Sequence, residues 1–222
     1  TQAGTSRRLI VGEAGTGSLS VAGTGRVTLD GPLQLAALST ATGTVSLEGG
    51  ILTAPRISKG NGTAAWSFDG GVLRAGASSS MFMQGLSQAT VAAGGALIDT
   101  QNFSITIAQP LLHASDLAGA DGGLIKRGSG SLTLTAANSY TGTTAVEAGT
   151  LRLAHAAALG SGGVRVETGG LLALAPQLVA QVTAVDFAGG RIDLGNGRLE
   201  SAAGGITEAA IRTAATTGRG SG

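Results

Sequence analysis

The sequence predicts an all-β protein, a single-stranded parallel β-helix (β-solenoid) with a short helix at its C-terminal end. Stretches such as SITI (104–107) and RIDL (191–194) alternate apolar and polar residues, which is the two-residue period of a half-buried strand. Glycine contributes 39 of the 222 residues, and glycine pairs end these stretches as turn signals do. The segment SLEGGILTA (46–54) returns as SFDGGVLRA at 67–75. Such a repeated unit buries its apolar face only by stacking on its neighbours.

The length of one coil follows from the glycine that opens each turn. Successive turn glycines are 18 to 28 residues apart, about 23 on average. We therefore expect a first domain over residues 1–205 that contains roughly 9–10 coils. Each coil bends at its glycine, since a residue without Cβ tolerates positive φ. The aligned glycines are Gly31, Gly49, Gly70, Gly94, Gly122, Gly149, Gly169 and Gly189.

The expected strands follow the alternating stretches along the chain. Their Leu, Val, Ile and Phe side chains point inward, and their Thr, Ser and Arg side chains point outward. A β-sandwich is the alternative all-β fold, but it does not explain the repeat that aligns Glu48 with Asp69. In chain order the strands are expected at 27–29, 44–47, 65–68, 104–107, 131–135, 150–153, 164–166 and 191–194.

Two segments interrupt this pattern. Residues 75–88 contain few alternations, and Met81, Phe82 and Met83 form a dense apolar group. We interpret that segment as an irregular corner packed on the rod, with a ligand-binding patch as the alternative. The second interruption, residues 109–123, is expected to form a longer loop.

The C-terminal segment 206–222 has a different character and is expected to form a short helix followed by a Gly/Ser tail. Thr207 is a suitable N-cap, Glu208 lies in the first turn, and an Ala-rich run follows. The helix is expected at about 207–216. There it would cap the last coil, whose apolar face is otherwise bare.

Composition excludes several classes of protein. The formal net charge is +1 and the basic residues are scattered, so we expect no nucleic-acid partner. The chain has no Cys, which excludes disulfides and thiolate metal sites. No apolar run approaches the roughly 18 residues of a membrane span. Apolar residues make up 42% of the chain, too many for a disordered protein.

Three acidic residues are the first candidates for chemistry, because Asp30, Glu48 and Asp69 precede turn glycines. If stacked at one corner, they would form an acidic ladder that acts as a Ca²⁺ site or as a catalytic carboxylate pair. The favoured interpretation is that they are solvated turn residues. The same interpretation applies to the loop acids Asp99, Asp116 and Asp121.

The remaining candidates are isolated. His113 and His155 each lie alone among Ala and Leu residues, without the spacing of a metal or catalytic motif. The outward arginines indicate a solvated strand face that resists sideways pairing, with an acidic glycan as the alternative ligand. These arginines are Arg74, Arg152, Arg165 and Arg191. We therefore assign no catalytic, cofactor-binding or metal-binding residue, expect no cofactor, and do not predict an enzyme.

The segment GGLIKRGSGSLTLTAANSYTGTTAVEAGTLRL (122–153) resembles the autotransporter-associated β-strand repeat of bacterial passenger domains. That repeat combines a G-G-L-x-K-x-G-x-G-x-L-x-L start with a later N-x-Y-x-G-x-T and a final G-T-L. The matching residues are Gly123, Leu124, Lys126, Gly128, Gly130, Leu132, Leu134, Asn138, Tyr140, Gly142, Thr144, Gly149, Thr150 and Leu151. The resemblance implies a secreted or surface β-solenoid that aids its own export and forms a stalk.

The function predicted from these observations is structural. We expect a stalk or adhesin-like passenger module that is secreted or displayed on the outer surface of a bacterium, with a glycan or another cell-surface molecule as partner. Two alternatives remain open at this stage. One is a filament subunit that associates end to end with further copies, since a solenoid has open ends. The other is a polysaccharide lyase or hydrolase.

Overall fold

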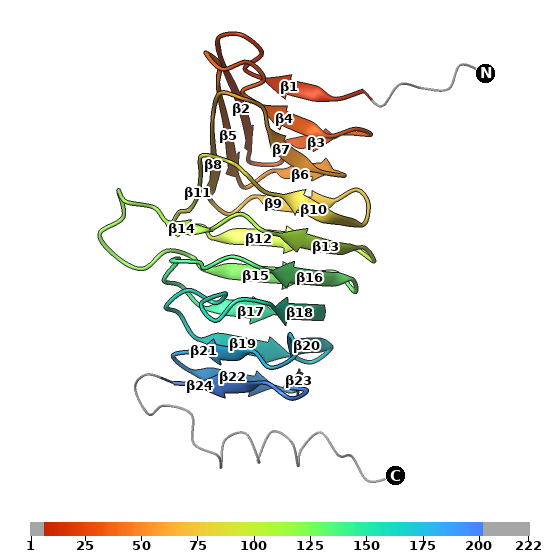
Figure 1. The fold of residues 1–222 in the computed structure, drawn as a ribbon, viewed down its shortest axis with the longest axis vertical. Coiled ribbons are helices and arrows are strands. Elements are labelled where there is room, and N and C mark those ends of the chain that lie inside the picture. Colours follow the sequence, from red (N-terminus) through yellow and green to blue (C-terminus); the bar gives the residue numbers. More distant parts are fainter. Residues whose placement is uncertain (1–6, 202–222) are drawn as a thin grey trace, which may run out of the picture.

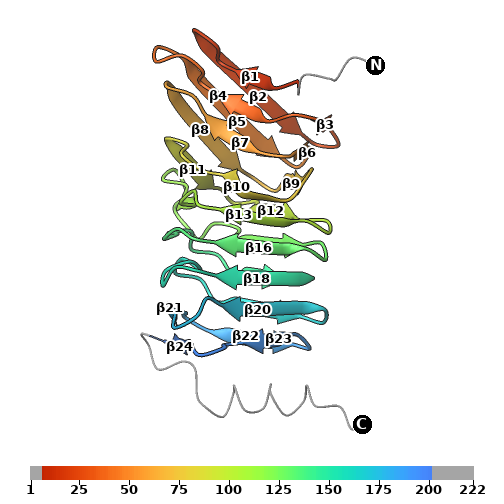
Figure 2. The same cartoon turned by 45° about the vertical axis from the view of Figure 1, so that its right-hand side comes forward.

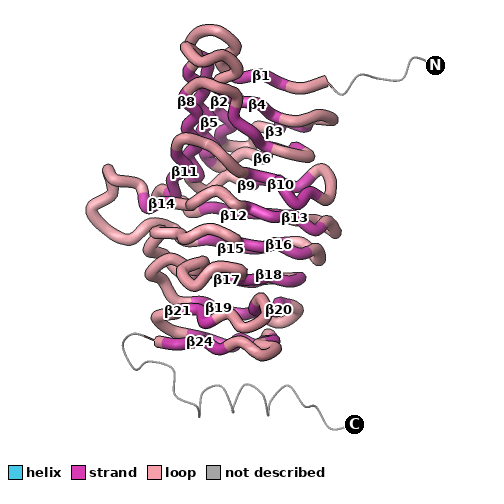
Figure 3. Tube along the Cα trace, viewed as in Figure 1, coloured by secondary structure: helices cyan, strands magenta, loops and turns pink. Residues whose placement is uncertain are grey.

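The computed structural model describes residues 7–201, and these form a parallel β-helix of about nine coils (Figure 1). The described residues contain strands, turns and loops but no helix (Figure 3). Accordingly, none of them forms a helix long and apolar enough to cross a membrane. The expected helix at 207–216 and the domain boundary after residue 205 lie outside the described residues.

The strands form three long parallel sheets and one short one, which we name sheets A to D. Sheet A contains β1 (Leu9–Val11), β4 (Leu33–Leu35), β7 (Ile57–Lys59), β10 (Ser79–Met83), β13 (Ser104–Ile107), β16 (Ser131–Leu134), β18 (Gly149–Leu153), β20 (Gly170–Leu174) and β23 (Arg191–Asp193). Sheet B contains β2 (Thr16–Ala22), β5 (Thr42–Glu48), β8 (Thr63–Phe68), β11 (Gln88–Val91) and β14 (Leu112–His113). Sheet C contains β3 (Arg26–Thr28), β6 (Ile51–Ala54), β9 (Val72–Ala75), β12 (Ala96–Asp99), β15 (Leu124–Arg127), β17 (Thr144–Val146), β19 (Val164–Glu167) and β22 (Val185–Ala188). Sheet D contains β21 (Val179–Gln181) and β24 (Arg198–Glu200).

The repeated sequence segments stack directly on each other, as predicted. Ser46 pairs with Ser67 in β5 and β8, and Ile51 pairs with Val72 in β6 and β9. Figure 2 shows these strands as successive rungs of the rod. Because the register places like residues above like, inward side chains form continuous columns that make one core. One such column on sheet C runs through Leu52, Leu73 and Ile98.

The number of residues in each coil falls part of the way along the rod. In sheet A, Leu9 pairs with Leu33, 24 residues later, and Ile105 pairs with Leu132, 27 residues later. Leu132 then pairs with Leu151, only 19 residues later. Sheet B ends at β14, so the next two coils have strands only in sheets A and C. A third strand returns with β21 and β24, which occupy the chain position between sheets A and C.

The turn glycines do not form the single column that the sequence suggested. Gly49 and Gly70 lie at the corner between sheets B and C, and so do Gly94 and Gly122. The other four lie at the corner between sheets C and A. That second group comprises Gly31, Gly149, Gly169 and Gly189. The single alignment was therefore wrong, because both corners carry the same glycine signal in sequence.

The segment 75–88 is not the irregular corner that we expected. The whole apolar group, Met81, Phe82 and Met83, lies in strand β10 of sheet A. Phe82 and Met83 are consecutive and both buried, which breaks alternation, and the register with β13 shifts between Ser79 and Met83. Such a bulge lets two neighbouring side chains face the same side. Met81 remains 45% exposed. The expected loop in 109–123 is present after the two-residue strand β14.

Candidate functional site

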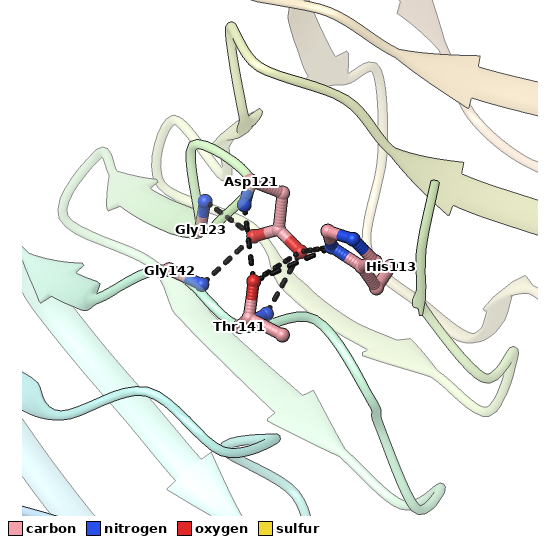
Figure 4. A network of polar contacts seen from close by, with 5 residues as sticks. All are labelled: His113, Asp121, Gly123, Thr141 and Gly142. Atoms are coloured by element: carbon pink, nitrogen blue, oxygen red, sulfur yellow. Dashed lines mark hydrogen bonds and ion pairs between the residues drawn. The ribbon is translucent and has the colours of Figure 1, made fainter. Parts of the chain in front are cut away.

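The most distinctive group of polar side chains lies where sheet B ends. The chain leaves β14, forms a loop that projects from the rod, and returns to β15 (Figure 1). Figure 4 shows the side chains that close the base of this loop. We call His113, Asp121, Gly123, Thr141 and Gly142 the loop clasp. It joins the loop to the segment that precedes β17 in the next coil.

Asp121 is the centre of the loop clasp. Its Oδ1 accepts hydrogen bonds from the backbone N–H groups of Gly123 (2.9 Å) and Gly142 (2.8 Å). Its Oδ2 accepts from the backbone N–H of Thr141 (2.8 Å) and lies 2.8 Å from His113 Nδ1. The Asp121 side chain is fully buried, whereas the His113 side chain is 26% exposed. The carboxylate thus accepts the hydrogen bonds of backbone N–H groups that have no strand partner in this loop.

The two titratable groups of the loop clasp stabilise each other's charge. Burial by itself raises the pKa of the Asp121 carboxyl, but the hydrogen bonds from His113, Thr141, Gly142 and Gly123 outweigh it, so the pKa lies below its ordinary value. The hydrogen bond to Asp121 raises the pKa of the His113 imidazole, although desolvation opposes this. The pair therefore favours a carboxylate facing an imidazolium.

The geometry of the loop clasp differs from that of a catalytic triad. In a triad, one imidazole nitrogen binds the carboxylate and the other faces the nucleophile. Here Thr141 Oγ1 lies 3.3 Å from His113 Nδ1, the same nitrogen that faces Asp121, and donates to Asp121 Oδ2 at 3.2 Å. His113 is therefore not positioned to activate this hydroxyl. Within residues 7–201, no group of three His, Asp or Glu side chains could hold a metal ion.

A second polar tie involves Lys126, which points into the core from β15. Its Nζ donates to the backbone carbonyls of Arg127 (3.0 Å), Gly128 (2.7 Å) and Ala148 (2.9 Å). These three acceptors match the three donors of an ammonium group. Burial lowers the pKa of Lys126 to about 8, and the charge of Asp99 opposes this shift. Lys126 thus binds carbonyls at the corner between sheets C and A in two successive coils.

Asn138 and Tyr140 lie on the side of the rod where sheet B has ended and no strand follows. Asn138 Oδ1 accepts from the backbone N–H of Leu111 (2.9 Å), and its Nδ2 donates to the carbonyl of Ala158 (2.6 Å). This one side chain therefore connects three successive coils. The Tyr140 hydroxyl lies 2.7 Å from Thr144 Oγ1, and burial raises the Tyr140 pKa.

Two glycines of this segment are required by close backbone contact. A Cβ at Gly130 would lie 2.0 Å from the carbonyl oxygen of Phe103. A Cβ at Gly142 would lie 2.3 Å from the carbonyl oxygen of Asp121. Real Cβ atoms do not approach backbone oxygen so closely, so any larger residue would push neighbouring coils apart. The glycines of the repeat motif therefore lie where the backbones of stacked short coils come closest.

The three acids expected at one corner are divided between two. Glu48 is the last residue of β5, and Asp69 directly follows β8, which stacks on β5 in sheet B. Asp69 Oδ1 accepts from the backbone N–H of Gly94 (2.7 Å). Asp30 follows β3 and lies at the corner between sheets C and A, so the predicted three-acid ladder was wrong. The cause is again the glycine signal shared by both corners. Asp116 is exposed on the projecting loop.

The other predicted candidates form local structural contacts. His155 Nδ1 accepts from the backbone N–H of Ala157 (3.1 Å) in a turn. Arg74 pairs with Asp99 (2.9 Å), and Arg165 pairs with Asp186 (2.9 Å), each across adjacent strands of sheet C. Arg152 and Arg191 face outward from sheet A, as the alternation predicted.

Sequence reasoning treated His113 as isolated and missed the loop clasp. The partner, Asp121, is eight residues away, and the intervening loop brings the two side chains together. The signal that could have found it was a lone His and an Asp at opposite ends of a segment without alternation.

Comparison with known proteins supports the resemblance stated above. Residues 124–153 match the passenger-associated-transport-repeat family. No curated protein and no solved structure matched the chain. The matched residues contain Lys126, Asn138, Tyr140 and the Thr141 and Gly142 contacts of the loop clasp. The predicted identity is thus confirmed at the level of the repeat, because a passenger-type repeat lies within a parallel β-helix.

Proposed function

We propose that this passenger-type β-helix repeat protein is a structural rod, secreted or displayed on the outer surface of a bacterium, where it acts as a stalk. The passenger repeat and the solenoid fold suggest a structural rather than a catalytic role. Nine coils at about 4.8 Å each would give a rod about 43 Å long. Such a module separates whatever lies at its two ends by a fixed distance.

The observation that carries this proposal is how the polar side chains around the matched repeat are used. Asp121, Lys126 and Asn138 are buried, and each binds backbone groups of more than one coil. A reactive site instead aims polar groups at a space where a substrate can bind. Here the same groups stabilise the stacking of coils, which is the property that a stalk requires.

Surface display of the full chain tests the proposal. The chain would be fused between a secretion signal and an unrelated outer-membrane anchor in a Gram-negative host, with an epitope tag at the end distal to the anchor. We expect antibody to label intact cells and the displayed rod to resist added protease. Retention inside the cell, while a control passenger on the same anchor is displayed, would contradict the proposal.

A further inference from the structure

The outward face of sheet B is covered by hydroxyl groups in rows that run from coil to coil. The inward residues of β5 and β8, among them Val45, Trp66 and Phe68, are buried, so the residues between them face solvent. In order of coils, the outward rows are Thr16, Thr42 and Thr63; Ser18, Thr44, Ala65 and Gln88; and Ser20, Ser46, Ser67 and Thr90, after which the third row ends at Leu112 of β14. Figure 2 shows the four strands that carry these rows. No residue in the three rows is charged.

Acidic residues border this face on the side of sheet C, and Lys59 lies on the opposite side, where its Nζ donates to the carbonyl of Gly62 just before β8 (3.0 Å). Glu48 and Asp69 are exposed at the strand ends nearest sheet C, and Ser46 Oγ donates a hydrogen bond to Glu48 Oε1. By contrast, the outward face of sheet C carries ion pairs between coils, such as Arg127 with Glu147 (2.7 Å). Because the three rows of sheet B carry no charge of their own, and Glu48 and Asp69 lie at one side of them, this face suits an uncharged polar ligand better than an anionic one.

The middle row contains a hollow at Ala65. Ala65 lies between Thr44 and Gln88, so a small methyl group replaces a longer side chain at this point. The hollow has a volume of about 260 Å³. Its lining includes the side-chain positions Thr44, Ser46, Ala65, Ser67, Gln88 and Thr90. This is slightly below the volume of pockets that hold drug-sized ligands, and it suits a single small ring.

The lining combines an apolar floor with unused hydrogen-bonding groups. Within residues 7–201, the side chains of Ser67 and Gln88 make no hydrogen bond, so both can donate and accept. Thr44 Oγ1 donates to the carbonyl of Gly17 (3.4 Å), and Thr90 Oγ1 donates to that of Trp66 (3.3 Å). Those two oxygens keep lone pairs that can accept further hydrogen bonds. A sugar ring presents the complementary pattern, with C–H groups on its face and hydroxyls around its edge.

We infer that this hollow binds one unit of a neutral glycan, whose chain continues along the hydroxyl rows parallel to the rod axis. The sugar face rests on the Ala65 methyl, and its hydroxyls bind Ser67, Gln88 and Thr90. Neighbouring hydroxyls repeat at the coil spacing of about 4.8 Å, so further sugar units find similar partners. This binding goes beyond the proposed stalk function and is measured on the purified chain, so either idea can fail alone.

Titration of the purified full chain with neutral hexasaccharides of glucose, galactose, mannose and N-acetylglucosamine tests the inference. Oligogalacturonate of the same length serves as the charged comparator. We expect saturable binding of at least one neutral probe with a Kd on the order of 1 mM, since an open hollow offers few contacts. Saturable binding of oligogalacturonate with equal or higher affinity would overturn the inference, as would no binding of any neutral probe.

Two matched arginine variants locate the site. Ala65→Arg fills the hollow, whereas Ala145→Arg makes the same change at an outward alanine of sheet C. We expect Ala65→Arg to weaken binding at least tenfold and Ala145→Arg to leave it unchanged. Gln88→Ala removes an exposed side chain without adding bulk and is expected to weaken binding several-fold even if Ala65→Arg fails to fold. Unchanged binding in Gln88→Ala, or equal losses in both arginine variants, would refute this location.

Discussion

The coils before β14 and those that follow it solve the same packing problem in different ways. In the first group, sheets A, B and C all supply strands, and the interior is filled by apolar side chains such as Trp66, Phe68 and Phe82. In the second group, loops replace sheet B for two coils (Figure 3). Asn138 and Tyr140 are buried beside these loops.

The difference shows what a strand contributes beyond its side chains. A strand in a parallel sheet satisfies its own backbone groups through the ladder, whereas a buried loop needs other partners for them. Within residues 7–201, every buried polar or charged residue lies between residues 100 and 144, around the end of sheet B. These residues are Thr100, Gln109, Asp121, Lys126, Asn138 and Thr144. Among these residues, Asp121 and Asn138 bind backbone groups of the loops at the end of sheet B. Thr100 and Lys126 instead bind carbonyls at the corner between sheets C and A.

The largest expected effect comes from removing the centre of the loop clasp. Asp121→Ala would leave the backbone N–H groups of Gly123, Thr141 and Gly142 without their acceptor. We expect the free energy of unfolding to fall by about 3–5 kcal/mol, measured by urea denaturation.

Asp69→Ala is the matched control in the three-sheet coils. That carboxylate accepts from one backbone N–H, that of Gly94, at an exposed corner. We expect a loss below about 1 kcal/mol. Similar losses for both variants would show that the end of sheet B has no special dependence on buried polar groups.

A smaller effect is expected from the charge on Lys126. Burial lowers its pKa to about 8, whereas a lysine in the unfolded chain titrates near 10.4. Between these pH values the unfolded chain keeps a proton that the native chain has lost, so stability rises with pH, by at most about 1.4 kcal/mol per unit. Below pH 8 both states are protonated and Lys126 contributes no slope.

Denaturation midpoints measured between pH 7 and 10.5 check this sign. Lys126→Met should remove the slope, although it also lowers stability at pH 7 because three carbonyls lose their donor. Val146→Met places the same side chain at the stacked inward position of the next coil and should keep the slope. Stability that falls between pH 8 and 10 in the unmodified chain would contradict the assignment.

Alternation predicted strands in the three-sheet coils and also in the two-sheet coils, where the expected strands 131–135 and 150–153 correspond to β16 and β18. It did not predict what fills the interior of the two-sheet coils. Alternation and the aligned segments 46–54 and 67–75 determine strand, face and register, because a one-residue slip would expose the core. Residues 136–143 show no alternation that would predict burial, yet Asn138 and Tyr140 are buried. Their polar atoms bind carbonyl and N–H groups of neighbouring coils, and these partners cannot be identified from the local sequence pattern. The loop clasp was missed for the same reason.

The last prediction concerns one side-chain hydrogen bond inside the two-sheet coils. Tyr140 and Thr144 are both fully buried, and their hydroxyls lie 2.7 Å apart. Tyr140→Phe removes one partner without changing the ring, and Thr144→Val removes the other at nearly equal volume. Each single variant is expected to lose about 1–2 kcal/mol, because Tyr140→Phe leaves the Thr144 hydroxyl without this partner and Thr144→Val leaves the Tyr140 hydroxyl only the carbonyl of Ala158 at 3.5 Å. The double variant should lose less than the sum of the two, because it buries no unpaired hydroxyl. Strict additivity in a double-mutant cycle would mean that the two hydroxyls do not interact. The interior of the two-sheet coils would then be stabilised by packing rather than by this polar contact.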